Sequence, residues 1–431
     1  PISENHTWAK CGGTYVDNKY YCYNVEGTWT QYTLTYTVLD ATSWTVLKTQ
    51  SWTYKYSQSD SEESQKARYV PSAVGYDPAS DKLYAFTHRF ANSDDGQMAV
   101  IDRETGELSK VADTRFVSAT ACGADGQIFA IGLDGNLYKV SASGEFTLVG
   151  HTGYYPTRDA ETNCGAAIDF RTGQMYWTFF GFNDSTDRDY NRNGFTGLLT
   201  VDTATGAASL SWTYPRLEYF SALAVQNAHP SAPDNIYDLA FTPLSKGSAD
   251  GQISFTIPSV TYAQHPLTGD ITVECFVDDV NLGRETGTPG QKYTKTIEGL
   301  STGNHTASVV LYANDQQSTT SYSTHFFGTD TPQAVENFTL TFDENEGRAT
   351  LTWNMPETGR QGGAIDFDDL RYQIVRMPGG VSVARSAKGT SFSEQTDYPF
   401  GSYYYRIQPY YNSDPQIKGG ITSSNRLQMG N

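Results

Sequence analysis

The chain has 431 residues, a formal net charge of −18, and 13% aromatic residues beside only 18% charged residues. This length predicts roughly two to four domains, and the acidic balance excludes nucleic acid as a partner because like charges repel a phosphate backbone. No apolar run approaches the roughly 20 residues that a membrane-spanning helix needs, so we expect no transmembrane segment.

Four internal repeats fill the first half of the chain, and each places an aromatic residue in a strand that follows a turn. The aligned aromatic residues are Tyr21, Tyr84, Phe129 and Tyr176. A second pattern follows each of them: a strand, a tight turn that begins at Asp or Ser, and another strand. The alternation of apolar and polar residues has the period of two that a half-buried strand requires.

Most of these repeats are about 45 residues long, which is the length of one propeller blade of four antiparallel strands. A small sheet cannot bury both of its faces alone, whereas sheets stacked around an axis bury them against their neighbours. We therefore predict a β-propeller-like domain over residues 1–228 with four to five blade units. The strand expected at residues 219–225 would begin the fifth unit, and it either closes the ring or marks a ring whose other blades lie upstream.

A proline-containing linker at residues 227–233 separates this region from a different repeat. Residues 232–242 match residues 331–341, and the offset of about 100 residues is the length of one immunoglobulin-like sandwich. We predict a first immunoglobulin or fibronectin type III-like sandwich over residues 234–329 and a second over residues 333–431. The whole chain is then expected to be all-β.

The second of these sandwiches resembles a fibronectin type III domain. Its Trp353 and the following Pro356 resemble the early core tryptophan of that family, and its segment 403–407 resembles the late tyrosine strand. The first sandwich is a weaker match, because Phe255 stands where the tryptophan is expected. The full layout resembles secreted multidomain proteins of anaerobic gut bacteria that carry a β-propeller-like region before tandem fibronectin type III-like domains.

That resemblance implies a fold and an extracellular or outer-surface location, but no chemistry. The chain begins at Pro1 rather than at a methionine, which we interpret as the loss of an upstream signal or a trimmed end.

Five cysteines occur in the chain, and none forms a C-x-x-C pair, so the sequence favours neither a zinc site nor a redox motif. They are Cys11, Cys22, Cys122, Cys164 and Cys275. Two interpretations remain open: a hairpin disulfide between Cys11 and Cys22, or small buried apolar side chains.

One segment has the alternating oxygen-bearing side chains that can wrap a calcium ion. The candidate ligands are Asp187, Asp189, Asn191 and Asn193. Gly194 would allow the sharp turn, but Thr200 stands where a calcium loop would place its bidentate glutamate. The segment is therefore either a calcium site with a substituted ligand or a solvated hairpin insertion. We predict no other cofactor.

Aromatic side chains crowd the first half of the chain, and exposed aromatic faces can stack on sugar rings. The tryptophans there are Trp8, Trp29, Trp44, Trp52, Trp177 and Trp212. A loop between two blades carries the candidate ligand-binding residues, which are Tyr154, Tyr155, Arg158 and Asp159. A second candidate lies near Tyr214 and Tyr219. The alternative interpretation is that most of these aromatic residues fill gaps between blades.

The sequence favours a binding or adhesion protein over an enzyme, because no catalytic motif of a known nucleophile, metal or phosphate site occurs in it. In this hypothesis a propeller presents a site for a glycan or a surface protein, and the sandwiches act as spacers. Two alternatives stay open: a secreted carbohydrate-active hydrolase or lyase on a propeller, and a purely structural surface component.

Overall fold

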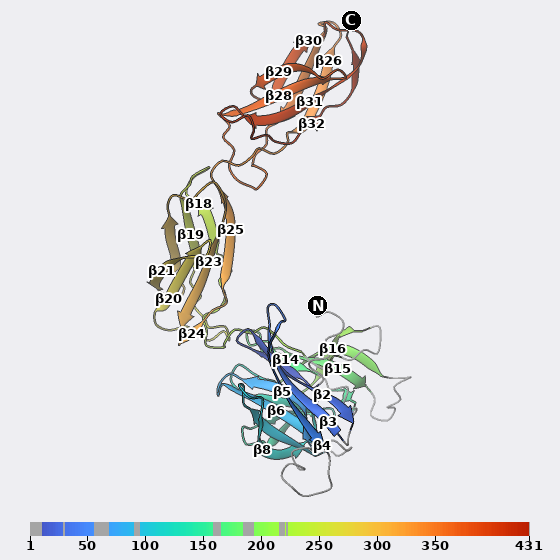
Figure 1. Cartoon of the computed structure of the whole chain (residues 1–431), viewed down its shortest axis with the longest axis vertical. Helices are drawn as coiled ribbons and strands as arrows, with labels where there is room; N and C mark the ends of the chain where they lie inside the picture. Colours follow the sequence, from blue (N-terminus) through green and yellow to red (C-terminus); the bar gives the residue numbers. More distant parts are fainter. Residues whose placement is uncertain are drawn as a thin grey trace. The chain divides into compact units, whose positions relative to one another are not determined.

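The computed structural model describes residues 11–28, 31–55, 69–89, 95–157, 165–183, 194–214, 220 and 223–430. All regular structure within these ranges is β-strand (Figure 1). None of the described residues belongs to a helix of the length and apolarity that crossing a membrane requires. The chain divides into two compact units, of which the first comprises Pro1–Asp234, Val260–Leu267 and Asn314–Ser318.

The first unit contains four antiparallel sheets, and the strands of each sheet pair in the order in which they occur in the chain. Sheet 1 consists of β1 (Gly13–Val16), β2 (Lys19–Thr28), β3 (Gln31–Asp40) and β4 (Val46–Lys55). Sheet 2 consists of β5 (Tyr69–Asp77), β6 (Lys82–Arg89), β7 (Asp95–Ile101) and β8 (Leu108–Arg115). Sheet 3 consists of β9 (Val117–Cys122), β10 (Ile128–Gly132), β11 (Asn136–Val140) and β12 (Phe146–His151).

Sheet 4 has the same order with one addition. It consists of β14 (Ala166–Ile168), β15 (Met175–Phe182), β16 (Phe195–Val201) and β17 (Ala208–Thr213), and the short β13 (Tyr155–Pro156) also pairs with β15. The predicted alignment of the four repeat aromatics is confirmed, because each lies in the second strand of its sheet. Their partners on the first strand are small: Thr14, Gly75, Ala121 and Ala167.

Consecutive sheets pack face to face and bury three apolar cores. The cores contain Tyr23, Tyr36 and Leu83 between sheets 1 and 2, Phe86, Met98 and Ala130 between sheets 2 and 3, and Leu137, Trp177 and Phe179 between sheets 3 and 4. The first strands of successive sheets are neighbours as well, because β1 contacts β5, β5 contacts β9, and β9 contacts β14. Stacking in this order leaves one face of sheet 1 and one face of sheet 4 outside the three cores.

The turn between the third and fourth strands has the same hydrogen bonds in sheets 1, 2 and 4. An aspartate carboxylate accepts from the backbone N–H groups two and three residues later, and the aspartate carbonyl accepts from the N–H four residues later, as at Asp102 and Asp202. The last donor is a glycine in the left-handed region, with φ of 75° at Gly106 and 83° at Gly206. In sheet 1 the equivalent residue is Trp44, with φ of 57°.

These turn glycines allow each sheet to approach the sheet before it. A Cβ atom at Gly206 would lie 2.7 Å from the backbone of Gly150, and one at Gly144 would lie 2.6 Å from the Cβ of Ala112. The turn of sheet 2 contacts sheet 1 in the same way, with Gly106 against the ring of Tyr36. Close approach without a side chain is therefore a repeated feature of the three junctions.

Gly206→Ala should lower the free energy of unfolding by about 3 kcal/mol, because the methyl group both strains the left-handed backbone and overpacks the junction with Gly150. Six of the seven tryptophans lie before residue 234, so tryptophan fluorescence during urea unfolding of the full chain reports mainly on this unit.

Gly153→Ala is the matched control, because Gly153 has φ of 86° but nothing within 4 Å of an added Cβ. It should cost only about 1 kcal/mol from backbone strain. Equal losses for the two variants would contradict the docking argument.

Two β-sandwiches follow, and each has one sheet of three strands and one of five. The first contains β18 (Ala240–Pro243), β19 (Gly251–Thr256), β20 (Ile271–Val277), β21 (Val280–Gly287), β22 (Lys292–Ile297), β23 (Gly303–Ala313), β24 (Gln316–Gln317) and β25 (Ser321–Phe327). The second contains β26 (Glu336–Asp343), β27 (Arg348–Asn354), β28 (Leu370–Met377), β29 (Val381–Ala387), β30 (Ser391–Gln395), β31 (Gly401–Tyr411), β32 (Thr422–Ser423) and β33 (Leu427–Met429).

The two sandwiches share one topology strand for strand. The three-stranded sheets have the orders β18-β19-β22 and β26-β27-β30, and the larger sheets are built on β21-β20-β23-β24 and β29-β28-β31-β32. The expected core tryptophan, Trp353, is buried against Tyr372, and Phe255 takes its place in the first sandwich against Tyr293. Two tandem fibronectin type III-like sandwiches are thus confirmed, while the exact boundaries at residues 228, 234, 329 and 333 stay predictions.

The described cysteines behave as small buried apolar side chains. Cys22, Cys122 and Cys275 are buried free thiols, and the Sγ of Cys22 donates to the carbonyl of Thr37 at 3.6 Å. The alternative of a bond between Cys11 and Cys22 is therefore wrong. Burial raises the pKa of the Cys22 thiol to about 12, which makes it unreactive. Cys164 lies outside the described residues.

A buried histidine in β23 of the first sandwich contacts the turn between β20 and β21. The Nδ1 atom of His305 lies 2.5 Å from a carboxylate oxygen of Asp278, and its Nε2 lies 2.9 Å from the carbonyl of Ser301. Both partners are acceptors, so the doubly protonated ring satisfies them best. Burial alone would lower the pKa of His305, but the hydrogen bonds to Asp278 and Ser301 outweigh it and raise the pKa above the ordinary value.

The raised pKa of His305 gives the first sandwich a pH-dependent contribution to stability. That contribution is fully present below about pH 6.5, the pKa of an unfolded histidine, and is lost as the pH rises through the folded pKa. Asp278→Asn should lower the pKa of His305 below 6.5 in an NMR titration of the full chain, because burial then acts without the carboxylate. Asp279→Asn, a neighbour on the same turn, should leave the titration unchanged, and a shift of equal size in both variants would contradict the assignment.

Candidate functional site

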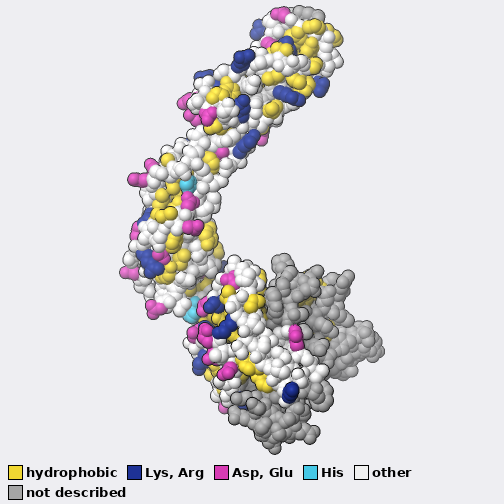
Figure 2. Space-filling view, viewed as in Figure 1, with side chains coloured by type: hydrophobic (Ala, Val, Ile, Leu, Met, Phe, Trp, Pro, Cys, Tyr) yellow, Lys and Arg dark blue, Asp and Glu magenta, His cyan; other side chains and the backbone are white. Residues whose placement is uncertain are grey.

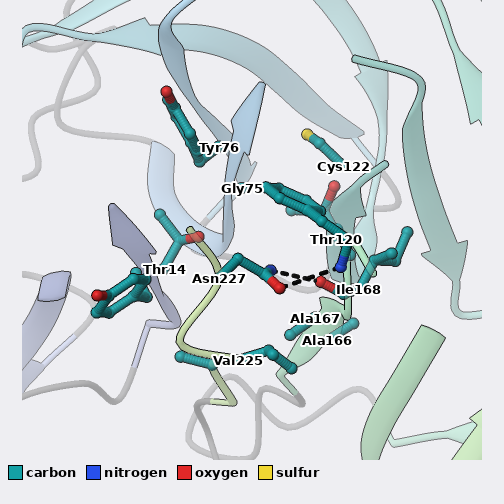
Figure 3. Close-up of a pocket in the computed structure, with 14 residues that line it drawn as sticks. Thr14, Gly75, Tyr76, Thr120, Cys122, Ala166, Ala167, Ile168, Val225 and Asn227 are labelled. Carbon is teal, nitrogen blue, oxygen red and sulfur yellow. Dashed lines mark hydrogen bonds between the residues drawn. The ribbon is translucent and has the colours of Figure 1, made fainter. Parts of the chain in front are cut away.

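The first strands of all four sheets line one small cavity in the first unit (Figure 3). Its volume is about 30 Å³, which holds roughly two water molecules and excludes a sugar ring. The lining residues from these strands are Thr14, Tyr15, Gly75, Tyr76, Thr120, Ala121, Cys122, Ala166, Ala167 and Ile168. Most of these side chains are small because the four strands converge here, and the convergence leaves little space between them.

A segment that follows sheet 4 completes the wall of this cavity and connects sheet 4 to sheet 1. The amide of Asn227 accepts from the backbone N–H of Phe170 at 3.0 Å and donates to the carbonyl of Ile168 at 2.7 Å (Figure 3). The neighbouring Gln226 donates to the carbonyl of Ala41 at 3.2 Å. Ala224 packs against a small cluster on sheet 1.

This segment is the one that the sequence predicts as the strand 219–225. Its described residues, 220 and 223–225, form no strand, so that prediction is wrong for them. Tyr219 lies outside the described residues.

The cavity offers no chemistry for catalysis. No residue in its lining is charged, and none is a histidine. The thiol of Cys122 is the one candidate nucleophile among the lining residues, and burial raises its pKa far above the ordinary value. The described lining is thus that of a small gap between the converging strands.

The predicted ligand-binding loop divides into residues with different roles. Tyr154 packs edge-to-face against Phe179 and Phe195, with ring centroids 5.4 and 5.9 Å away, and it belongs to the core between sheets 3 and 4. Tyr155 is half-buried in β13, with its ring 4.9 Å from that of His151. Arg158 and Asp159 lie outside the described residues, so this site stays a prediction.

The predicted calcium ligands Asp187, Asp189, Asn191 and Asn193 also lie outside the described residues. Across the part of the chain that the structure describes, no group of three or more His, Cys, Asp or Glu side chains could hold a metal ion.

His88 is a buried titratable group near the end of β6, an inner strand of sheet 2. Its side chain is 5% exposed, its ring lies 5.0 Å from that of Phe116, and neither ring nitrogen has a hydrogen-bond partner among the described residues. Burial lowers the pKa of His88 to about 4, so the ring is neutral at pH 7. Without a carboxylate partner it resembles a packing residue rather than a general base.

Two surfaces outside the cores carry the chemistry that a neutral ligand would use. The outer face of sheet 1 presents hydroxyl groups, with Thr33 bonded to Thr53 and Thr35 to Ser51, both at 3.1 Å. The outer face of sheet 4 presents an aromatic row. Trp212 packs edge-to-face against Tyr214 at 5.0 Å, and Tyr214 packs against Phe220 at 5.1 Å.

The tryptophans that the sequence analysis treats as one group differ in exposure in the structure. Trp177 is fully buried, Trp52 is packed against a core, and Trp44 and Trp212 are exposed by 38% and 52%. Trp8 and Trp29 lie outside the described residues. Aligning the turns of the repeats would have singled out Trp44, because it stands at a position where the other repeats have glycine.

On the side of the molecule shown in Figure 2, acidic and basic side chains are interspersed over both sandwiches and do not gather into a patch of one charge.

No protein-family model and no curated protein matches the chain. Among solved structures, it is similar to a crystal structure of chicken CNTN1 domains FN1–FN3, with 11% identity over 60% of this chain and 94% of that chain and a TM-score of 0.20. It is also similar to a two-domain fibronectin type III segment of chicken tenascin, with 15% identity over 46% of this chain and all of that chain and a TM-score of 0.21.

A further similarity is to domains d3–d4 of the rat CD45 extracellular region, with 13% identity over 25% of this chain and 56% of that chain and a TM-score of 0.19. TM-scores this low carry no argument about function. The assignment of this chain as an all-β protein with tandem fibronectin type III-like sandwiches rests on its own sheet topology.

Tyr154→Ala should lower the free energy of unfolding of the first unit by about 2 kcal/mol, because it removes a half-buried ring from the core between sheets 3 and 4. Tyr154→Phe keeps the ring and should cost less than about 1 kcal/mol. Urea unfolding followed by tryptophan fluorescence measures both variants. A loss for Tyr154→Phe as large as that for Tyr154→Ala would show that the hydroxyl, not the ring, carries the contribution.

Proposed function

We propose that the chain is a non-enzymatic extracellular binding or adhesion protein, in which a propeller-like first unit carries the ligand site and the two sandwiches act as spacers. The ligand is a glycan on a surface. The observation that carries this proposal is the contrast between a small axial cavity with an uncharged lining and exposed faces rich in aromatic and hydroxyl groups.

The propeller-like arrangement has two lines of support. Four sheets of four or five strands stack in chain order through their faces, and their first strands share one cavity. The segment around Gln226 and Asn227 bonds to both sheet 4 and sheet 1, which is the contact that closure of a ring requires. Four blade units are consistent with these contacts, and the predicted fifth unit is not needed.

Binding is favoured over catalysis because the residues that line the axial cavity include no charged side chain and no histidine. A propeller enzyme would place its catalytic groups at this axis. A glycosidase needs two carboxylates that face each other across a substrate. The axial cavity has no carboxylate and is too small for a sugar. A hydrolase or lyase site elsewhere in the chain remains the alternative, and the experiment below tests it.

An extracellular location is supported by the tandem sandwiches and by the resemblance of the layout to secreted proteins of gut bacteria. The buried thiols of Cys22, Cys122 and Cys275 are compatible with an oxidising environment, because burial keeps them from reacting. The segment that leaves the sheets is anchored by the buried carboxylate of Asp234, which Arg171 contacts at 3.3 Å and Gln264 at 3.0 Å.

A glycan array probed with the full chain tests this function, together with an assay for newly formed reducing ends or unsaturated sugars on the same glycans. We expect binding to at least one glycan without any product. Release of product would contradict the non-enzymatic assignment and favour the hydrolase or lyase. The absence of binding to every glycan would contradict the glycan assignment and favour a structural component.

A further inference from the structure

The fourth sheet and the first sheet differ from the other sheets at the positions where consecutive sheets meet. On the fourth strands of sheets 2 and 3, the residue that meets the next turn is small, Ala112 or Gly150, and the facing residue is a turn glycine. Trp212 is the residue of sheet 4 that corresponds to Gly150 of sheet 3. Each lies in the fourth strand of its sheet and is the first residue after the β-bulge that pairs with the third strand. The residue of sheet 1 equivalent to the turn glycine is Trp44.

Both replacements lie on the faces that the stacking leaves outside the three cores. Trp212 pairs with Leu198, which faces away from the core that contains Leu199. Trp44 lies 5.9 Å from the ring of Tyr20, which belongs to the outer face of sheet 1. Two bulky, exposed tryptophans therefore stand where the other junctions need the smallest residues.

The surroundings of the two tryptophans are mainly aromatic and hydroxyl-bearing, with the carboxylate of Asp40 in the turn that contains Trp44. The outer face of sheet 4 adds Tyr214 and Phe220 to Trp212, and the edge-to-face contacts hold these rings in place. The outer face of sheet 1 adds a ladder of hydroxyl groups that the pairing of β3 with β4 places side by side: Thr33, Thr35, Thr49, Ser51 and Thr53. Lys48 of β4 pairs with Glu104 of sheet 2, on the opposite side.

We propose that these two faces form one cleft at the junction of sheets 4 and 1, which binds an uncharged glycan between Trp212 and Trp44. The proposal rests on the propeller-like closure under the proposed function. The tryptophan rings stack on the apolar faces of the sugar rings, and the hydroxyl ladder of sheet 1 exchanges hydrogen bonds with the sugar hydroxyls.

The charge of the protein selects for an uncharged ligand. A net charge of −18 repels anionic polysaccharides. Lys55 lies on the same face of sheet 1 as the hydroxyl ladder, but Glu26 on that face carries the opposite charge, and strands β16 and β17 of sheet 4 contain no basic side chain. A protein strand that adds to the edge of β17 is the competing occupant, because that strand has no charged residue to protect its edge. The aromatic and hydroxyl groups on the faces favour the glycan, since strand addition would not use them.

The test measures binding of the full chain to cellohexaose, xylohexaose, mannohexaose and laminarihexaose by isothermal titration calorimetry, with polygalacturonate as the anionic comparison. We expect one or more of the neutral hexasaccharides to bind and polygalacturonate not to bind. Trp212→Ala and Trp44→Ala should each weaken that binding at least tenfold. Leu210→Ala should change it by less than twofold, because Leu210 is exposed on the same strand but pairs with Leu199, on the other face.

The outcomes separate this cleft from the proposed function. Neutral glycan binding that both tryptophan variants retain would overturn the cleft and leave the proposed function standing. Binding only to polygalacturonate would overturn the uncharged ligand class. A concentration-dependent dimer in light scattering that both variants abolish, without glycan binding, would overturn the glycan and assign the faces to a second copy. Unchanged urea unfolding of each variant shows that loss of binding is not loss of the fold.

Discussion

The first unit depends on one constraint: a sheet of four strands has two faces, and it can remove both from water only by packing against other sheets. Each consecutive pair meets this constraint with an apolar core and with a turn glycine that lets the backbones approach. Because an added Cβ atom would overlap the neighbouring sheet at these turns, the junctions tolerate little variation. The exposed Trp44 and Trp212 differ from the residues at these junctions, because they lie on the faces of sheets 1 and 4 that belong to none of the three cores.

The sequence predicts the strands of this unit well because the repeat combines a turn with a period of two. Tyr84 and Phe129, for example, lie in the second strands of their sheets as aligned. The stacking partner of each face is harder to predict, since alternation identifies two faces but not which neighbour covers each one. Tyr154 illustrates this limit: the sequence places it in a loop between two blade units, and only the structure shows that its half-buried ring packs against the core between sheets 3 and 4.

The sandwiches are predictable for a different reason, which is that their core positions recur about 100 residues apart. Trp353 and Phe255 occupy one position and are both buried, so the aromatic character of the position matters more than the residue type. The polar contacts inside the first sandwich were not predictable. His305 in β23 meets Asp278, which lies 27 residues earlier in the turn between β20 and β21, and no local pattern marks the pair.

The meander order of the sheets has a consequence for how the protein is made. Every strand of a sheet in the first unit pairs with a strand close to it in the chain, so each sheet can form as soon as its own segment leaves the ribosome. The contact between Gln226 and Ala41 spans 185 residues and has to wait until all four sheets are present. Assembly would thus proceed from local to global, with the joining of last sheet to first as its final event.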